Sequence, residues 1–435
     1  MSSGDRFYPI HPSQLVVGLY VWVDLPWMDH PFLRSKMLLT SESDVLAVQA
    51  SGAEGCLYWN PARSKSSPLP REPVAVSPAT EALAEVVDDL IESKRARELE
   101  QLRQVTQAAR RSWDALSLSV WAVVHDMPRS PVSVGDKVTS LAFDVVEATE
   151  NASAWQLRKL GDSTNRGQHH HALRTMTLSV MIGTQLGMSQ HELHDLAIAA
   201  LAHDVGQSDI PYPRINPVQP RVAGRPNYTV DHGHVQRHVE RSLELAHMSG
   251  VFTKESLQII AQHHAAMDGS GWPRDTSDIC MGARILALAD RFDRLCSPSG
   301  AEEPPLPPSS AVIQMFRSES RRYDSSVLQA FIKLIGIYPP STILRLDDGS
   351  IAMVVAPGAR AHQPLMAVYD RAVLPQEAPL QVLGAEGSPA VLSVINETGL
   401  PSAVLDWLEK IEMRMAATPV SLLRHEASEL APESE

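Results

Sequence analysis

The sequence predicts a mainly α protein, in which a helical bundle follows a small N-terminal α/β or β module and precedes a short C-terminal β segment. Of the 435 residues, 44% are hydrophobic but only 5% are aromatic, which favours helices packed through Leu, Ala, Val and Met. Apolar residues recur at spacings of three and four along the middle of the chain. Short β-branched runs bounded by turn residues occur towards both ends.

Residues 1–65 are expected to form the N-terminal module, because 15–23 is a β-branched and aromatic run of strand character. Prolines cluster at 61–78 and mark a linker. A helical pattern with mixed charges follows over 79–125, so linker and long helix together fill 66–128. This helix fits two interpretations equally well: it dimerises as a coiled coil, or it packs on its own domain.

Residues 129–335 are expected to form the helical domain. Ser189 and Glu192 make a capping-box pattern that opens a helix running into His203, and Gly187 stands where the preceding helix should end. The proline-rich stretch 207–233 predicts a long loop of the kind that often serves as a lid or binding loop, and a second proline cluster at 298–308 predicts a disordered or mobile loop.

The last third of the chain returns to strand character. Residues 342–346 and 351–355 flank the turn residues 347–350, which predicts a β-hairpin. A final helix is expected near 400–416. The predicted domains are therefore completed by a β-hairpin segment with a helix at 336–420 and a polar tail at 421–435.

Charge and cysteine usage limit the partners. A net charge of −13 argues against a nucleic acid polymer held by a basic surface, although bound cations could still attract a small anion. Cys56, Cys280 and Cys296 are too far apart to indicate a disulfide framework or a thiolate metal site. We find neither a signal peptide nor about 18 consecutive apolar residues, so we expect a cytoplasmic protein with no membrane partner.

Histidines and aspartates at helix ends are the strongest functional signal. The chain has 17 histidines, and His203-Asp204 ends the apolar helix 196–202. Asp290 stands in an otherwise apolar helix, where a carboxylate is rare unless it is paired or binds a metal. Neutral imidazoles and carboxylates are ligands for Fe, Mn, Co or Zn. The remaining candidates of this type are His171, His238, His263 and His264.

The region 165–300 resembles an HD-GYP domain, a branch of the HD phosphohydrolase superfamily that hydrolyses cyclic di-GMP. The family pattern has a leading His, then HDxGK about 32 residues later, a single His, HHExxDGxGYP and ARILAxAD. Here His171 precedes His203 by 32 residues, His238 is the single His, and 263–273 and 283–290 correspond to the last two motifs. Residues 24–32 resemble part of the small domain that often precedes HD-GYP domains in bacteria, so we expect a bacterial source.

The resemblance implies a helical HD-type bundle that holds two divalent metal ions, most readily Fe or Mn. One ion would bind His171, His203, Asp204 and Asp290, and the other Asp204, His238, His263 and His264, with Asp204 as a bridge. His203 and Asp204 would be catalytic. The substrate loop beside the metals would comprise Asp268, Gly269, Gly271, Trp272 and Pro273. The implied function is a phosphodiesterase of bacterial signalling that converts cyclic di-GMP to the linear dinucleotide or GMP. The implied partner is the cyclic dinucleotide; other signalling proteins, and a second copy of the chain bound through the helix at 79–125, are further expected partners.

Several positions depart from the family pattern. Gln207 replaces the Lys of HDxGK, and so offers a dipole where the family has a full charge. Ala265 replaces Glu, Trp272 replaces Tyr, and 297–303 carries none of the usual cations. Gly167 stands where some members place a Glu, which argues against a third metal. Arg284, Arg291 or Arg294 could substitute for the lost cations.

These departures leave three functions open. The first is a slow phosphodiesterase, since losing one charge-assisted phosphate contact costs about 1.5–3 kcal/mol. The second is a degenerate HD-GYP module that binds metal or nucleotide and regulates partner proteins without turnover. The third, a different nucleotide phosphohydrolase of the superfamily, is disfavoured by the 268–273 loop. Of the other histidines, His169 and His170 compete with His171, which only its spacing favours. The rest are expected on the surface: His191, His194, His232, His234 and His247.

Overall fold

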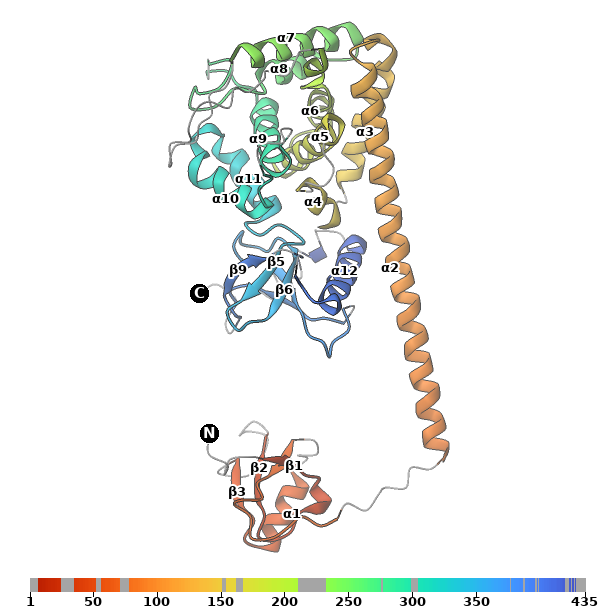
Figure 1. Ribbon diagram of the computed structural model, residues 1–435, viewed down its shortest axis with the longest axis vertical. Coiled ribbons are helices and arrows are strands. Elements are labelled where there is room, and N and C mark those ends of the chain that lie inside the picture. The colour runs from red at the N-terminus through yellow and green to blue at the C-terminus, as the bar shows by residue number, and fades with distance from the viewer. Residues whose placement is uncertain are drawn as a thin grey trace. The chain divides into compact units, whose positions relative to one another are not determined.

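The computed structural model describes residues 7–24, 35–51, 56–70, 78–150, 154–161, 167–209, 232–274, 277–298, 304–375, 377–385, 388–395 and 399–418, together with 397, 422, 423, 425 and 427. The chain forms two compact units, Met1–Ser93 and Lys94–Glu435 (Figure 1). We describe each unit by itself. Among the described helices, none is both long enough and apolar enough to cross a membrane.

The first unit holds a small antiparallel sheet. Its strands are β1 (Tyr8–Pro9), β2 (Tyr20–Val23), β3 (Lys36–Leu38) and β4 (Leu57–Trp59), in the order β1-β4-β2-β3. The unit also contains a short 3-10 helix, η1 (Pro12–Gln14), and α1 (Glu42–Ala50), and it extends to Ser93. The predicted N-terminal β module is confirmed. The strand is shorter than the run 15–23, because Gly18 turns the chain with a φ of +97° before β2 begins.

The long helix α2 spans Pro78–Asp126, as the pattern over 79–125 predicts. Its last turns pack into the core of the second unit through Trp113, Val120 and Val123. This packing agrees with the interpretation in which the helix covers its own domain. Dimerisation through α2 stays a prediction.

The helical domain contains α3 (Pro131–Glu150), α4 (Ala154–Leu160), α5 (Gln168–Gln185), α6 (Gln190–Ala202), η2 (Val205–Asp209), α7 (His232–Ser249), α8 (Lys254–Gln262), α9 (Met281–Cys296), α10 (Pro308–Ser318), η3 (Ser320–Arg322) and α11 (Ser325–Ile335). The mainly α fold class is therefore confirmed. The capping box at Ser189 is present, with the Glu192 Oε2 accepting from Ser189 N at 2.8 Å. Gly187 takes a positive φ directly after α5, as expected of a helix-ending glycine.

The helix α5 lies at the centre of this domain, between α6 and α9 (Figure 1). Every residue from His171 to Gly183 is buried, so this helix is surrounded on all sides. The neighbouring α6 is almost as deeply buried over 195–202. A polar side chain on α5, at the end of α6 or on the inner face of α9 therefore lies inside the domain. The predicted proline-rich loop at 207–233 lies mostly outside the described residues, as does part of 298–308; Pro308 itself begins α10.

The C-terminal part forms an antiparallel sheet with the order β8-β7-β6-β5-β9. Its strands are β5 (Ile343–Leu346), β6 (Ile351–Ala356), β7 (Leu365–Val368), β8 (Leu380–Val382) and β9 (Val391–Ile395), and α12 (Ser402–Ala417) packs against β6. The predicted hairpin is the β5–β6 pair, with Ile343 opposite Met353. The sheet is larger than that hairpin. The predicted domain boundaries at 65/66, 128/129 and 335/336 fall between elements and stay predictions, because the two compact units divide at 93/94.

Candidate metal centre

The seven predicted ligands come from five helices and meet inside the helical domain. His171 lies in the first turn of α5, His203 and Asp204 directly follow α6, His238 lies on α7, His263 and His264 directly follow α8, and Asp290 lies on α9. Six of them are at most 8% exposed, and His264 is half-buried. Buried ionisable side chains of this number require mutual pairing or a bound cation.

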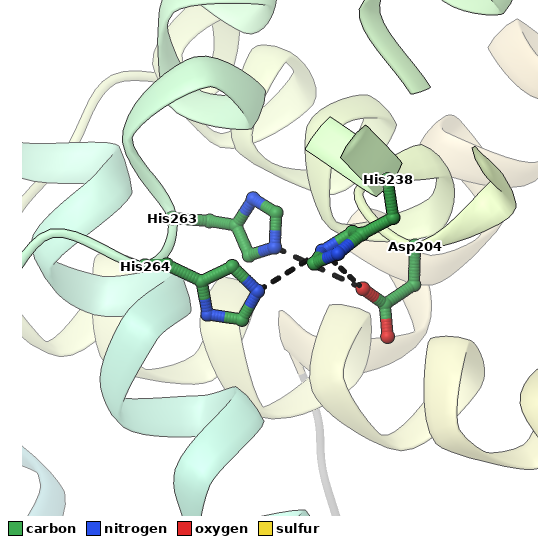
Figure 2. A group of neighbouring side chains, drawn as sticks. All are labelled: Asp204, His238, His263 and His264. Atoms are coloured by element: carbon green, nitrogen blue, oxygen red, sulfur yellow. Dashed lines mark hydrogen bonds and ion pairs between the residues drawn. The ribbon is translucent and has the colours of Figure 1, made fainter. Parts of the chain in front are cut away.

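The side chains form two groups that share Asp204. In each group the potential ligand atoms all lie within 4.8 Å of one another. We call the group of His171, His203, Asp204 and Asp290 site A. We call the group of Asp204, His238, His263 and His264, drawn in Figure 2, site B.

The two oxygens of Asp204 face different sites. Its Oδ2 lies 3.5 Å from His171 Nε2 and 3.6 Å from His203 Nε2, in site A. Its Oδ1 lies 3.4 Å from His238 Nε2 and 3.8 Å from His263 Nε2, in site B (Figure 2). A carboxylate in this position can bridge two cations.

The backbone fixes how two of the histidines present their nitrogens. The Nδ1 of His203 donates to the carbonyl of Ala200 at 2.8 Å, and the Nδ1 of His263 donates to the carbonyl of Ile260 at 2.7 Å. A carbonyl can only accept, so each Nδ1 carries the proton and the Nε2 of each ring faces inwards. Both rings gain this partner because they stand just past the last turn of a helix, where carbonyls lack intrahelical donors.

A carboxylate fixes the ring of His171. Its Nδ1 donates to Asp293 Oδ2 at 2.7 Å, and the buried Arg174 holds the other oxygen of Asp293 through Nε. Hydrogen bonds of this kind orient metal-ligating histidines and raise their basicity. Asp293 and Arg174 were missed at the sequence level. The one available signal is that Asp293 stands three residues after Asp290, on the same helical face.

Two buried atoms show that the donor set fits a metal. Asp204 Oδ1 and His263 Nε2 have no hydrogen-bond partner among the described residues. Leaving a buried acceptor unpaired costs about 1–3 kcal/mol, and more for a charged group. Both atoms face the middle of site B, so a divalent cation there would satisfy both. Their nitrogen and oxygen donors suit a borderline transition metal.

Charge within the centre shifts several pKa values. Burial alone would raise the pKa of Asp204, but His203, Arg294, His238 and His171 outweigh it and hold that pKa well below its usual range. Burial lowers the pKa of His264 to about 3. Burial and Arg294 would lower the pKa of His171, but hydrogen bonds to Asp290 and Asp293 and the charge of Asp293 raise it to about 9. Site A therefore retains a proton at neutral pH, whereas His264 in site B does not.

Glycines allow the backbones around the centre to approach closely. A Cβ on Gly206 would lie 2.4 Å from the carbonyl oxygen of His238, so this glycine lets η2 bring Asp204 against α7. A Cβ on Gly271 would lie 2.2 Å from the carbonyl oxygen of His264. That same carbonyl accepts from Trp272 N at 3.0 Å. At both positions a residue with a Cβ would therefore overlap the neighbouring backbone.

The predicted substrate loop folds back over His264. Gly271 and Trp272 contact the backbone of that histidine, while Asp268 is exposed and accepts from Ser270 N at 3.0 Å. Gly269 has a φ of +73°, and the Trp272–Pro273 peptide bond is cis. The loop therefore lies beside site B. Its contact with substrate stays a prediction.

A pocket of about 200 Å³ opens beside the centre. Its wall includes His264, Asp290, Arg294, Arg322 and Ala265, the last standing where the family pattern has Glu. Of the arginines considered from sequence, Arg284 pairs with Asp324 at 2.9 Å and Arg291 pairs with the buried Glu319 at 2.7 Å. Only Arg294 contacts the centre, through Asp204 and Asp290. Which of the three arginines reaches the centre depends on the direction in which its side chain leaves α9. The sequence alone does not give that direction.

The competing histidines lie elsewhere. His170 Nδ1 lies 3.2 Å from Ser117 Oγ, and His169 lines a separate pocket with Trp121. His191 is on the surface, as expected. His194 is half-buried against the ring of Phe143, with centroids 4.2 Å apart, so its predicted surface position is wrong. The side chains of His232 and His234 lie outside the described residues.

Two family models match the chain. One described as "HD domain" covers residues 155–327, and one described as "Domain of unknown function (DUF3391)" covers residues 9–130. The cyclic di-GMP phosphodiesterase PA4108 of Pseudomonas aeruginosa is 24% identical over 353 residues, which are 80% of this chain and 81% of that protein. A cyclic di-GMP phosphodiesterase of Thermotoga maritima is 27% identical, over 41% of this chain and 47% of that protein. The 3'3'-cGAMP-specific phosphodiesterase 2 of Vibrio cholerae is 26% identical, over 38% of this chain and 31% of that protein.

The matched HD domain contains all seven clustered side chains, and the second match covers the N-terminal sheet and α2. The order of the motifs along the chain agrees with the same assignment. The chain therefore contains an HD domain over residues 155–327 and a DUF3391 region over residues 9–130, and it is similar to proteins named cyclic di-GMP phosphodiesterases.

Proposed function

We propose that this chain is a metal-dependent phosphodiesterase that hydrolyses cyclic di-GMP to the linear dinucleotide or GMP. The observation that carries the proposal is the pair of ligand groups sharing Asp204, with ligand atoms within 4.8 Å in each. Similarity to proteins named cyclic di-GMP phosphodiesterases supports the choice of substrate. Two divalent ions, Fe or Mn, would occupy sites A and B.

The two ions, when bound, would act as Lewis acids on a phosphoryl oxygen and lower the pKa of water. The protein's part is to hold the ligands in position. Fixed Nδ1 hydrogen bonds keep His203 and His263 in one tautomer. The buried Asp293 and Arg174 orient His171. Hydrogen bonds of this kind hold the donor atoms in position before substrate binds.

The neighbouring pocket suits one phosphodiester. Its volume of about 200 Å³ lies below the roughly 300–1,000 Å³ of a complete small-molecule pocket, so the rest of a dinucleotide would extend beyond it. Arg294 and Arg322 bring positive charge to its wall. Ala265 in place of Glu removes a negative charge from the same wall. We infer that these features compensate in part for Gln207, and that turnover is slow.

Binding without turnover is the second candidate. Gln207 lacks the charge of the Lys in the family pattern, and Glu319 neutralises Arg291 through two hydrogen bonds of 2.7 and 2.9 Å. Both observations reduce the number of cations available to a phosphate. In this case the chain would bind metal or nucleotide and act through partner proteins.

One assay separates the two candidates. The full chain is purified with Mn²⁺ or Fe²⁺ under reducing conditions, metals are counted, and cyclic di-GMP and 3'3'-cGAMP are followed separately by chromatography. We expect two ions per chain and slow loss of cyclic di-GMP. The double variant His203→Ala/Asp204→Ala should lose both ions and all turnover. His247→Ala, at an exposed position on α7, is the matched control and should retain both.

Two ions without turnover of either dinucleotide would reject the enzyme and leave the binding module. Turnover of 3'3'-cGAMP alone would correct the substrate. Less than one ion per chain, unchanged in the double variant, would reject the metal centre itself.

A further inference from the structure

The guanidinium of Arg294 lies between the two carboxylates of site A. Its Nη2 donates to Asp204 Oδ2 at 2.5 Å, and its Nε donates to Asp290 Oδ1 at 2.8 Å. Arg294 follows Asp290 by one turn of α9, so the backbone holds it at this position. The same two oxygens are the ones that site A would offer to a metal.

Site B has a different arrangement. Its carboxylate oxygen, Asp204 Oδ1, has no hydrogen-bond partner among the described residues. Its other members are imidazoles, with His264 Nε2 at 3.0 Å from His238 Nε2. The two hydrogen bonds of the guanidinium described above are therefore with carboxylate oxygens of site A.

A guanidinium and a divalent cation compete for such oxygens. Charge-assisted hydrogen bonds to a carboxylate use the lone pairs that a metal needs, and two positive charges at contact distance repel each other. The Arg294 side chain is 26% exposed and lines the pocket of about 200 Å³, so it has space to move away from the carboxylates. Site A can thus exchange an internal cation for a metal.

We propose that Arg294 is a tethered competitor of the metal at site A, and that it makes site A the weaker of the two metal sites. The proposal rests on the centre binding metal and not on the choice of substrate. Arg294 acts here as a residue that sets metal affinity. It neutralises the charges of Asp204 and Asp290 in the metal-free protein, and its hydrogen bonds to them break when a metal binds.

The test measures Mn²⁺ affinity in backgrounds that retain one site. Full-length His238→Ala retains the site A ligands, and full-length His171→Ala retains the site B ligands. Arg294→Gln is added to each, and Mn²⁺ binding is followed by calorimetry and by competition with a chelating dye. In the His238→Ala background we expect affinity to rise roughly 10- to 100-fold, because a charge-assisted contact no longer has to be broken. In the His171→Ala background we expect a smaller gain, because Arg294 contacts Asp204 through Oδ2 and not through Oδ1, which faces site B.

Two further variants control for charge and folding. Arg294→Lys retains the charge but loses the two-pronged contact, so its affinity should lie between those of wild type and Arg294→Gln. Arg284→Gln removes an arginine from the same helix that pairs with Asp324, and should leave Mn²⁺ affinity unchanged. Circular dichroism with and without Mn²⁺ reports folding of each variant. If Arg294→Gln is poorly folded without metal, Mn²⁺ affinity is compared between wild type and Arg294→Lys instead.

The outcomes separate this inference from the metal centre. Affinity that is unchanged or weaker in His238→Ala/Arg294→Gln, or an equal gain in both backgrounds, overturns the role of Arg294 while the centre stands. No Mn²⁺ binding to the wild-type chain overturns the metal centre and this inference together.

Discussion

Site A and site B share one aspartate but differ in how the protein balances their charge. Site A has two carboxylates, a histidine held by Asp293, and the guanidinium of Arg294. Site B has one carboxylate and three imidazoles, with at least one ring fixed by a backbone carbonyl. Site A is thus a network of charges, whereas site B is built mainly from neutral donors. The difference teaches that two metal ions bound at sites A and B would not have to respond alike to pH or to mutation.

Removing one ligand from each site gives the largest expected effect. His171→Ala should lose the ion of site A, and His264→Ala should lose the ion of site B, so each variant binds one Mn²⁺ instead of two. Phosphodiesterase activity should fall to background in both if both ions are needed. Metal counting by mass spectrometry after gel filtration makes the measurement, with His247→Ala as the control. Loss of both ions in either variant would show that the sites are not separable.

The pH dependence of metal binding should differ between the sites. The pKa of His171 is raised to about 9, so below that pH the ring carries a proton that a metal must displace. Affinity at site A should therefore rise with pH, by up to about tenfold per unit, and level off near pH 9. At site B the pKa of His264 is lowered to about 3 and that of His263 lies well below its usual range, so neither ring carries a proton that a metal must displace between pH 6 and 9, and affinity should depend less on pH than at site A.

Calorimetry in buffers of different ionisation enthalpy counts the protons released at each site. The one-ion variants His264→Ala and His171→Ala isolate sites A and B for this measurement. We expect close to one proton at site A and fewer at site B at pH 7. Equal proton release from both would remove the distinction between a charged and a neutral site.

The sequence predicts that the seven candidate ligand side chains lie close together, but it does not predict the contacts that support them; metal binding by these side chains stays a prediction. His171 was chosen over His169 and His170 by spacing alone, and it is the one that lies in the centre. The spacing works because each ligand stands in the first or last turn of a helix, or on its buried face. Asp293, Arg174 and Arg294 depend on how α5 and α9 are rotated towards each other, which sequence periodicity does not fix.

The same limit applies to the fold. Long helices such as α2 follow from local patterns, and so does the β5–β6 hairpin, whose strands are joined by a short turn. The partners of β5 and β6 on their other edges, β9 and β7, are separated from them by longer segments. Their pairing depends on tertiary packing, so the hairpin was predicted and the complete sheet was not.

Replacing Asp293 tests whether outer contacts act on site A alone. Asp293→Asn keeps the shape of the side chain but removes the charge that Arg174 and His171 share. Mn²⁺ affinity at site A should fall roughly 10- to 100-fold, as is typical when the partner of a ligating histidine is lost. Site B should be unaffected. Asp195→Asn is the control, because Asp195 is equally buried but accepts from Thr253 Oγ1, away from the centre.

Replacing Gly271 tests whether a change beside site B leaves site A unaffected, and it has the smallest expected effect. A Cβ here would lie 2.2 Å from the carbonyl oxygen of His264 and 2.6 Å from Ala266 N, and these backbone atoms cannot yield as a flexible side chain would. Gly271→Ala should shift His264 and weaken Mn²⁺ binding at site B by roughly tenfold, with a loss of about 1–3 kcal/mol in stability from overpacking.

Gly269→Ala is the matched control: its φ of +73° makes the substitution strained, but its Cβ would meet nothing closer than Arg274 O at 3.8 Å. It should therefore lower stability without changing metal affinity. If Gly271→Ala weakened site A as much as site B, the shared Asp204 would transmit the shift, and the two sites would have to be treated as a single unit.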